Sequence, residues 1–575
     1  MDKFRGYVTL LDALAVAPRE RPFVTMWHPD QNPVFQSFSF GQFLDLAQNF
    51  AAFFRDRGTQ PRDTVVLILP QDVLLMAGFV GAMVMGAIPT ILAYPTFKIN
   101  PEKYQRGLSG VTRNINARMV ILNRDFPPEL LGYITTHSNT HVIQVDERDF
   151  RSQGKGLTGA NPDPDNVAFI QHSAGTTGLQ KGVALPHRAV LSQLRHLADA
   201  LRLTDQDRIV SWLPLYHDMG LIACFVLPLA CHLHLVMESP TDWVLRPASL
   251  LQLASKYNCT LCWLPNFAFQ FMARRVPPEE RQSLDLSSMR AMINCSEPVR
   301  AQSMGEFYQA YCSYGLSRSA LRSSYAMAEN TFAVTLSGLD GASLPHTVWV
   351  ERDLFWDQRR AEIVPPDHPS GISFMSSGAC LRGNAVRVVS DDGTDLPEGW
   401  VGEILVRSDS MFYGYYNRPD LTSKTLRDGW YWTGDEGFLV DNEIYVIGRK
   451  DDTIIVGGKN LYPQDIEEIA CSHPDIHDGR AVAFGLYNQD LGTHDLVVVA
   501  EVNNQDGLKR RNQIEEEIRR AILGEIGVAP RFMKLVPPKW MVKSTAGKPA
   551  RSTNRSKFLR EHPELEYDHI ERRKG

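Results

Sequence analysis

The sequence predicts an α/β protein with a large N-terminal domain of parallel-rich sheets packed with helices, followed by a small α+β C-terminal domain. Over most of the N-terminal part, short apolar runs with strand character alternate with helical patterns, as in helices packed on mainly parallel sheets. The pattern changes after about Arg449, where two apolar runs, Val482–Leu486 and Leu496–Val502, precede an amphipathic helix. We therefore place the domain boundary between residues 1–450 and residues 451–575.

The spacing of apolar residues predicts the individual helices and strands. Val73–Tyr94 is nearly uncharged and almost long enough to span a bilayer, but several glycines and Pro89 interrupt it. We expect a buried helix over Val73–Met85 and a core strand over Ile88–Ala93, with no integral membrane segment. The amphipathic C-terminal helix is predicted from isoleucines at i, i+4 spacing, namely Ile514, Ile518, Ile522 and Ile526. The other expected strands are Thr64–Leu69, Met119–Leu122, Val167–Ile170 and Thr260–Leu264.

The composition is that of an ordinary soluble protein, with 43% apolar residues, 22% charged residues and a formal net charge of −6. This charge disfavours broad binding to nucleic acid or to anionic membranes, because both need a basic surface. The N-terminus shows no signal-peptide pattern and the eight cysteines are scattered, which favours the cytoplasm. Cys259 and Cys262 form one C-x-x-C, but a zinc site needs a second ligand pair, and the sequence offers none.

A segment rich in glycine and hydroxyl groups follows the expected strand Val167–Ile170. It reads Gln171-His172-Ser173-Ala174-Gly175-Thr176-Thr177-Gly178-Leu179-Gln180-Lys181-Gly182. Glycines let backbone N–H groups approach phosphate oxygens, the hydroxyls add donors, and the lysine supplies positive charge. The segment lacks the second glycine and the Lys-Ser/Thr step of a P-loop, and the next residues have strand character. We interpret it as a phosphate-binding segment, with a polar hairpin as the alternative.

This segment resembles the phosphate-binding signature of the acyl-adenylate-forming superfamily, which holds acyl-CoA synthetases, luciferases and the adenylation domains of peptide synthetases. Further segments resemble motifs of the superfamily in the same order, so the resemblance covers almost the whole chain. These segments are Asn294–Arg300, Tyr325–Glu329, Trp432–Asp435, Gly448–Asp452 and Ser544–Lys548.

The resemblance implies a site for ATP and Mg²⁺ between the two domains. Lys548 would reach the α-phosphate and the acid carboxylate, where charge develops in the transition state. Asp451 would be the hinge that makes the small domain mobile, and His217 would lie beside the acyl carboxylate. Glu329 and Thr176 would hold Mg²⁺. The residues implied to bind the nucleotide are Ser173, Gly175, Thr176, Thr177, Gly178, Lys181, Ser296, Glu297, Pro298, Tyr325, Ala326, Met327, Asp435 and Arg449.

Two of these residues have a specific expected role, and one has an unusual identity. By similarity Tyr325 stacks on adenine and Asp435 accepts hydrogen bonds from the ribose hydroxyls. Ala326 stands where the superfamily has glycine, which predicts an altered backbone if that position needs a positive φ.

Three segments resemble the fatty acyl-AMP ligase branch in particular: Leu213–Ile222, Leu264–Phe269 and Gly458–Glu467. This resemblance implies that a fatty acid is converted to acyl-AMP and then transferred to the phosphopantetheine thiol of an acyl carrier protein. The branch carries an insertion that obstructs the CoA-binding conformation, and residues 337–371 are the candidate, with an ordinary variable loop as the alternative. Four apolar residues on an expected helix either line an acyl slot or belong to the core: Phe267, Phe269, Phe271 and Met272.

Two other functions stay open at this point. One is a fatty acyl-CoA synthetase, which shares the adenylation step and differs in the thiol that accepts the acyl group. The other is a catalytically dead nucleotide-binding module, suggested by the substitutions at Ala174, Cys295 and Ala326.

Overall fold

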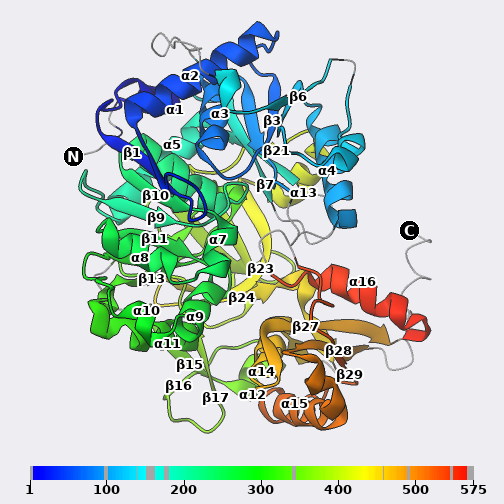
Figure 1. The fold of residues 1–575 in the computed structure, drawn as a ribbon. Coiled ribbons are helices and arrows are strands. Elements are labelled where there is room, and N and C mark those ends of the chain that lie inside the picture. The colour runs from blue at the N-terminus through cyan, green and yellow to red at the C-terminus, as the bar shows by residue number, and fades with distance from the viewer. Residues whose placement is uncertain are drawn as a thin grey trace.

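The structure is a computed structural model that describes residue 4 and residues 6–95, 101–137, 139–150, 162–173, 181–339, 345–456, 459–488, 493–543 and 548–565. Its N-terminal part contains three seven-stranded sheets packed with helices, and the C-terminal elements form a smaller group beside them (Figure 1). The expected α/β class is therefore confirmed.

The first sheet is largely parallel and has the strand order β21-β8-β7-β4-β3-β5-β6. Helices α2 (Phe40–Asp56) and α3 (Val73–Val84) pack against each other beside it. β7 and β8 are antiparallel and pair Ser173 with Lys181, so the two ends of the glycine-rich segment lie side by side. The strands are β3 (Thr64–Ile68), β4 (Ile88–Ile91), β5 (Met119–Asn123), β6 (His141–Val145), β7 (Val167–Ser173), β8 (Lys181–Pro186) and β21 (Gly414–Tyr415).

The second sheet has the order β13-β12-β11-β9-β10-β1-β2, and every neighbouring pair except β1 with β2 is parallel. Ligand sites of open parallel sheets lie at the carboxyl ends of the strands, and the segments after β9, β11, β12 and β13 all begin at that edge. The strands are β1 (Pro22–Trp27), β2 (Phe35–Ser39), β9 (Arg208–Ser211), β10 (His234–Glu238), β11 (Leu261–Leu264), β12 (Ala291–Asn294) and β13 (Leu321–Ser323).

A third sheet is antiparallel and carries the segments that resemble the ribose site and the hinge. Its order is β14-β18-β24-β23-β20-β19, and β22 (Leu426–Arg427) pairs with β23 as the seventh strand. Residues 345–375 carry α12 (Arg352–Gln358) and the three-stranded sheet β16-β15-β17, and Phe355 and Trp356 of α12 share a buried cluster with the C-terminal elements. The strands are β14 (Thr335–Leu336), β15 (Thr347–Glu351), β16 (Ile363–Val364), β17 (Gly371–Met375), β18 (Ala379–Cys380), β19 (Asn384–Val389), β20 (Gly402–Ser408), β23 (Trp430–Val440) and β24 (Glu443–Arg449).

The C-terminal elements are an α+β group around the sheet β27-β28-β29. The expected amphipathic helix is α15 (Arg511–Ile526), and its four isoleucines at i, i+4 spacing are all buried, as predicted. The remaining elements are β25 (Ile454–Val456), β26 (Lys459–Leu461), α14 (Pro463–Cys471), β27 (Ile476–Asn488), β28 (Thr493–Val502), β29 (Phe532–Val536) and α16 (Arg551–Glu561).

The uncharged stretch Val73–Tyr94 folds as predicted, into the buried helix α3 and the short core strand β4. Within the described residues, no helix has both the length and the apolar character needed to cross a membrane. Cys259 and Cys262 are buried, and burial raises the pKa of the Cys259 thiol to about 12. The described part of the chain contains no group of three or more His, Cys, Asp or Glu side chains placed to hold a metal ion.

Candidate active site

The loop after β12 is held in place by two asparagines at the carboxyl edge of the second sheet. Asn294 Nδ2 donates to Asn266 Oδ1 at 2.9 Å, and the same oxygen accepts the backbone N–H of Arg300 at 3.1 Å. Ser296 has a φ of 70°, a left-handed conformation that is uncommon outside glycine. Glu297 Oε2 accepts the backbone N–H of Phe267 at 2.9 Å, which ties this loop to α9 (Asn266–Arg275).

Lys548 reaches this loop from the C-terminal part of the chain. Its Nζ donates to the Ser296 carbonyl oxygen at 2.5 Å and lies 3.4 Å from Glu297 Oε1. The loop lies 252 residues from Lys548 in the sequence. The contact therefore places an ammonium group of the C-terminal elements at the carboxyl edge of the second sheet.

His217 and Asp218 follow β9 at the same edge and are electrostatically coupled to Lys548. Burial, aided by the Lys548 charge, lowers the pKa of His217 to about 4, so the imidazole is neutral at neutral pH. The Nε2 atom of His217 is buried and has no hydrogen-bond partner in the structure. Burial raises the pKa of Asp218 to about 6; nearby Glu329 adds to the rise, while the Met219 N–H and Lys548 oppose it. Perturbed titratable groups that cluster at one edge of a sheet are typical of a functional site.

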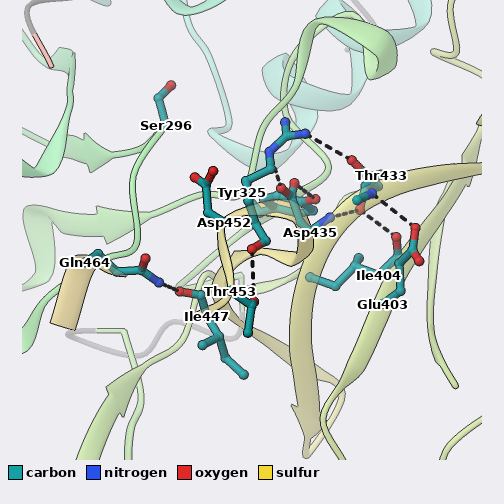
Figure 2. Close-up of polar contacts among 12 residues, drawn as sticks. Ser296, Tyr325, Glu403, Ile404, Thr433, Asp435, Ile447, Asp452, Thr453 and Gln464 are labelled. Carbon is teal, nitrogen blue, oxygen red and sulfur yellow. Dashed lines mark hydrogen bonds and ion pairs between the residues drawn. The ribbon is translucent and has the colours of Figure 1, made fainter. Parts of the chain in front are cut away.

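Asp435 is the centre of a hydrogen-bonded network on β23 (Figure 2). Tyr325 donates its hydroxyl to Asp435 Oδ2 at 2.6 Å, and Arg449 Nε lies 2.8 Å from Oδ1. Thr433 Oγ1 accepts the Asp435 backbone N–H at 2.9 Å and donates to the Ile404 carbonyl at 2.7 Å. Each carboxylate oxygen has two lone pairs, so Asp435 retains acceptor capacity for a ligand hydroxyl.

Glu329 connects this network to the end of the glycine-rich segment. Tyr415 donates its hydroxyl to Glu329 Oε1 at 2.7 Å, and Lys181 Nζ lies 5.0 Å from the centre of the Tyr415 ring. Glu329 also acts electrostatically on Asp435 and Arg449. Lys181, Glu329 and Asp435 therefore belong to one site rather than to separate surfaces.

Glu329 fits Mg²⁺ as part of a shared coordination shell. Mg²⁺ is usually held by one or two carboxylates together with substrate phosphates, and the buried carboxylate of Glu329, near the end of the segment expected to bind phosphate, fits that requirement. Thr176, the other expected ligand, lies outside the described residues.

Comparisons with known proteins agree with this geometry. Residues 13–416 match the AMP-binding enzyme family. The chain belongs to this family. The long-chain-fatty-acid–AMP ligase FadD32 of Mycolicibacterium smegmatis is 29% identical over 87% of this chain and 86% of its own length. A putative acyl-CoA synthetase of Caulobacter vibrioides is 27% identical, covering 97% of this chain and 96% of its own.

A solved structure from a study of fatty acyl-adenylate ligases of E. coli and L. pneumophila superposes with a TM-score of 0.88. It is 26% identical, and the match covers 98% of this chain and 99% of that one. The resemblance stated from the sequence motifs is confirmed, and this AMP-binding enzyme is a ligase of the acyl-adenylate-forming type.

The structure places some of the expected family residues and leaves others outside its described part. Ala326 is not among the described residues with a positive φ, so its backbone does not carry the strain that alanine would have in that conformation. Met327 donates its backbone N–H to Phe332, and Pro298 is half-buried at the end of the Ser296 loop. Outside the described residues lie Gly175, Thr176, Thr177, Gly178 and residues 544–547, together with the side chain of Ser173.

Several residues of this family site were not predicted from the sequence. Asp218 directly follows the predicted His217, and its perturbed pKa arises from burial, which the sequence does not display. Tyr415 lies on β21, a two-residue strand with no pattern of its own. Arg300 pairs with Asp465 at 2.5 Å and with Glu468 at 3.2 Å, both on α14 of the C-terminal part.

Buried neutral histidines predict that acid destabilises this fold. Burial lowers the pKa values of His172 and His187 to about 4, and His187 Nδ1 accepts the Leu10 backbone N–H. A histidine with a lowered folded-state pKa contributes stability above its unfolded pKa of about 6.5, and that stability is lost as pH falls towards 4.

We expect the free energy of unfolding to fall between pH 7 and pH 5, by roughly 2 kcal/mol for each of these two groups. Asp218 acts in the opposite direction, because its raised pKa favours the fold in acid. Thermal melts across this range measure the effect, and His187→Asn is expected to make the pH dependence shallower. A melting temperature that is constant or higher at pH 5 contradicts the prediction.

Proposed function

We propose that this protein activates a fatty acid with ATP and transfers the acyl group to the phosphopantetheine thiol of an acyl carrier protein. The observation that carries the first step is the contact of Lys548 with the Ser296 loop, opposite neutral His217. Relatives named as long-chain-fatty-acid–AMP ligases support the choice of a fatty acid.

In the proposed adenylation step, a carboxylate oxygen attacks the α-phosphorus of ATP, a new P–O bond forms, and pyrophosphate leaves with the electrons of the broken bond. Lys548 stabilises the charge that develops on the α-phosphate. His217, being neutral, lies beside the acid without competing for its negative charge. Asp435 holds the ribose hydroxyls, while Tyr325 lies alongside as the candidate surface for adenine. Glu329 would hold Mg²⁺ together with the phosphates, and the ion would supply positive charge that neutralises pyrophosphate.

The apolar residues after β11 divide into two sets, and one set supports a fatty acyl slot. Phe269 and Met272 are fully buried core residues. Phe267 and Phe271 are half-buried and face Trp243, with ring centres 6.1 and 5.4 Å away. We propose that this second face of α9 borders the acyl chain.

In the proposed second step, the small domain first turns at Asp451. The thiol sulfur then attacks the acyl carbon and forms the C–S bond, the thiol proton passes to solvent, and AMP leaves with the electrons of the broken C–O bond. Residues 345–371 support a carrier protein rather than CoA, because they bind the C-terminal part. Trp356 packs against Tyr462 with ring centres 5.8 Å apart, and Asp357 lies 3.3 Å from Lys459 Nζ. These contacts resist a turn of the small domain, so a partner that contributes binding energy of its own is favoured. The location that we propose remains the cytoplasm, in keeping with the eight free cysteines.

The test is to supply ATP, a panel of fatty acids and either CoA or a holo acyl carrier protein, and to identify the products by mass spectrometry. We expect acyl-AMP in all reactions with a suitable acid, and a thioester only with the carrier protein. Fast formation of acyl-CoA would instead favour the acyl-CoA synthetase alternative, which the Caulobacter relative's name supports. Absence of acid-dependent pyrophosphate exchange with every acid would favour a dead nucleotide-binding module.

Arg551 gives a prediction about how Lys548 is held. Three residues after Lys548, its guanidinium makes two 2.7 Å hydrogen bonds to Glu467 and one of 2.8 Å to Asp452, next to the proposed hinge. These three hydrogen bonds of the Arg551 guanidinium fix the chain just after Lys548. Arg551→Gln is therefore expected to lower kcat for adenylation roughly ten- to hundredfold with little change in KM.

Rates of pyrophosphate exchange measure this effect. Glu467→Gln should cause a similar loss, and the double variant should be no worse than either single one, because both remove the same contact. Arg560→Gln, at the exposed far end of α16, is the matched control and should behave as wild type. Strictly additive losses for Arg551 and Glu467 would show that the two residues act separately.

A further inference from the structure

Next to the proposed acyl slot lie three buried polar atoms that have no hydrogen-bond partner among the residues the structure describes. They are Glu238 Oε1, Trp212 Nε1 and Trp243 Nε1. Glu238 is 0% exposed, Trp243 0% and Trp212 5%. A buried polar group without a partner is unfavourable, so each of the three needs a physical explanation.

The strand register brings Glu238 and Trp212 together. β10 and β9 are parallel, with Met237 opposite Ser211, so the next residues, Glu238 and Trp212, leave neighbouring strands on the same face. Gln71 Nε2 donates to the backbone carbonyls that flank this place, Leu213 O at 3.1 Å and Glu238 O at 3.4 Å. The indole of Trp243 stacks on that of Trp212 with centres 4.0 Å apart and planes 2° from parallel.

The same place is continuous with the proposed active site. Phe267 lies against both indoles, 6.2 Å from Trp212 and 6.1 Å from Trp243, and its backbone N–H is bound by Glu297, which Lys548 contacts. Along the sheet, β12 with Ser296 is three strands from β10, which is about 14 Å at the usual strand spacing. Phe267 therefore links the two indoles to the loop that Lys548 contacts.

The chemical nature of these three atoms favours a ligand atom that accepts hydrogen bonds. Burial raises the pKa of Glu238 well above its ordinary value, which favours the neutral acid over the carboxylate. The Ser249 hydroxyl lies 2.5 Å from Oε2, which leaves Oε1 without a partner among the described residues. The two indole N–H groups are donors, and a carboxyl oxygen accepts or, when protonated, donates a hydrogen bond. An ammonium group would oppose the indole donors, and a plain methylene chain would leave all three atoms unpaired.

We infer that the acid substrate carries an oxygen along its chain, as a hydroxyl or carbonyl group, and that Glu238 with Trp212 and Trp243 binds it. This inference rests on the proposed fatty acid activation and specifies its substrate class. Hydrogen-bonding sites of this kind discriminate strongly, because the analogue without the oxygen leaves buried donors unpaired.

The test uses pyrophosphate exchange with acids of one length: a plain alkyl acid, hydroxy acids with the hydroxyl moved along the chain, and the corresponding keto acids. We expect wild type to favour an oxygenated acid at one chain position by tenfold or more in kcat/KM. Comparing the hydroxy and keto series identifies which oxygen is preferred. Glu238→Met should remove most of this preference, Glu238→Gln should keep much of it, and Trp243→Phe should fall between them.

A stability measurement separates a binding role from a structural one. Ser249 Oγ also donates to the Arg246 carbonyl at 2.7 Å, so it keeps a partner in Glu238→Met. Glu238→Met replaces a buried acid that has an unpaired oxygen with an apolar residue, so its melting temperature is expected to equal or exceed that of wild type. Glu279→Met, at an exposed position, is the control.

Two results would overturn the inference: a wild-type preference for plain alkyl acids over every oxygenated acid, or an unchanged preference in Glu238→Met. If Glu238→Met does not fold, the group is structural and the inference also fails. Failure of wild type to adenylate any acid would instead overturn the proposed function itself.

Discussion

Lys548→Ala is expected to lower kcat for acyl-AMP formation about 10²- to 10³-fold, the usual cost of removing one donor that faces developing charge. The ammonium lies 2.5 Å from the Ser296 carbonyl and 3.4 Å from Glu297, at the edge where His217 and Asp218 also end. KM for ATP should change little, because the lysine acts on the transition state more than on bound nucleotide. Acid-dependent pyrophosphate exchange measures both parameters.

Lys539→Ala is the control for this variant, since Lys539 is an exposed lysine of the same C-terminal part. We expect wild-type exchange from it. Both variants should melt like wild type, because the Lys548 side chain is 33% exposed and its ion pair contributes little to stability. A Lys548→Ala protein with full exchange activity would show that another group carries this charge.

Asp435→Ala is expected to raise KM for ATP about a hundredfold, because charge-assisted hydrogen bonds to two ribose hydroxyls are worth roughly 1.5–3 kcal/mol each. The substitution also removes the partners of Tyr325 and Arg449, which now bind its two oxygens. Unlike Lys548→Ala, Asp435→Ala is expected to change KM for ATP more than kcat.

Titration of the exchange rate with ATP measures this effect, and nucleotide binding by calorimetry checks it without turnover. Asp391→Ala removes an exposed carboxylate that pairs with Lys450, the residue after Arg449, and serves as the matched control. Equal nucleotide affinity in wild type and Asp435→Ala would contradict a ribose-binding role.

Much of the fold was predictable because its signals are local. The apolar run after Asp72 gave a buried helix and strand, and the four isoleucines of α15 all face the core. The C-terminal element order also followed from periodicity. Ala326 was the exception: the superfamily glycine suggested a positive φ, yet the backbone there needs none.

The site residues were predictable where they belong to a sequence motif. They were not predictable where burial in the folded protein sets their pKa or their hydrogen bonding. Asp435, Arg449 and Glu329 were expected from motifs, and the structure brings them together. Glu238 resembles any strand-end carboxylate in the sequence, and only the parallel pairing of β10 with β9 places it beside two indoles. The pairing of Arg551 with Glu467 spans 84 residues, a distance over which a sequence pattern carries no information.

The most direct test of this account is mass spectrometry of the products that the purified protein forms from ATP, Mg²⁺ and fatty acids, with Lys548→Ala in parallel. We expect the mass of an acyl-AMP from the wild-type protein and a loss of at least 10²-fold from the variant. Absence of any acyl-AMP from wild type across the panel, or equal amounts from both proteins, would contradict the claim that Lys548 and the Ser296 loop join an acid to the α-phosphate of ATP.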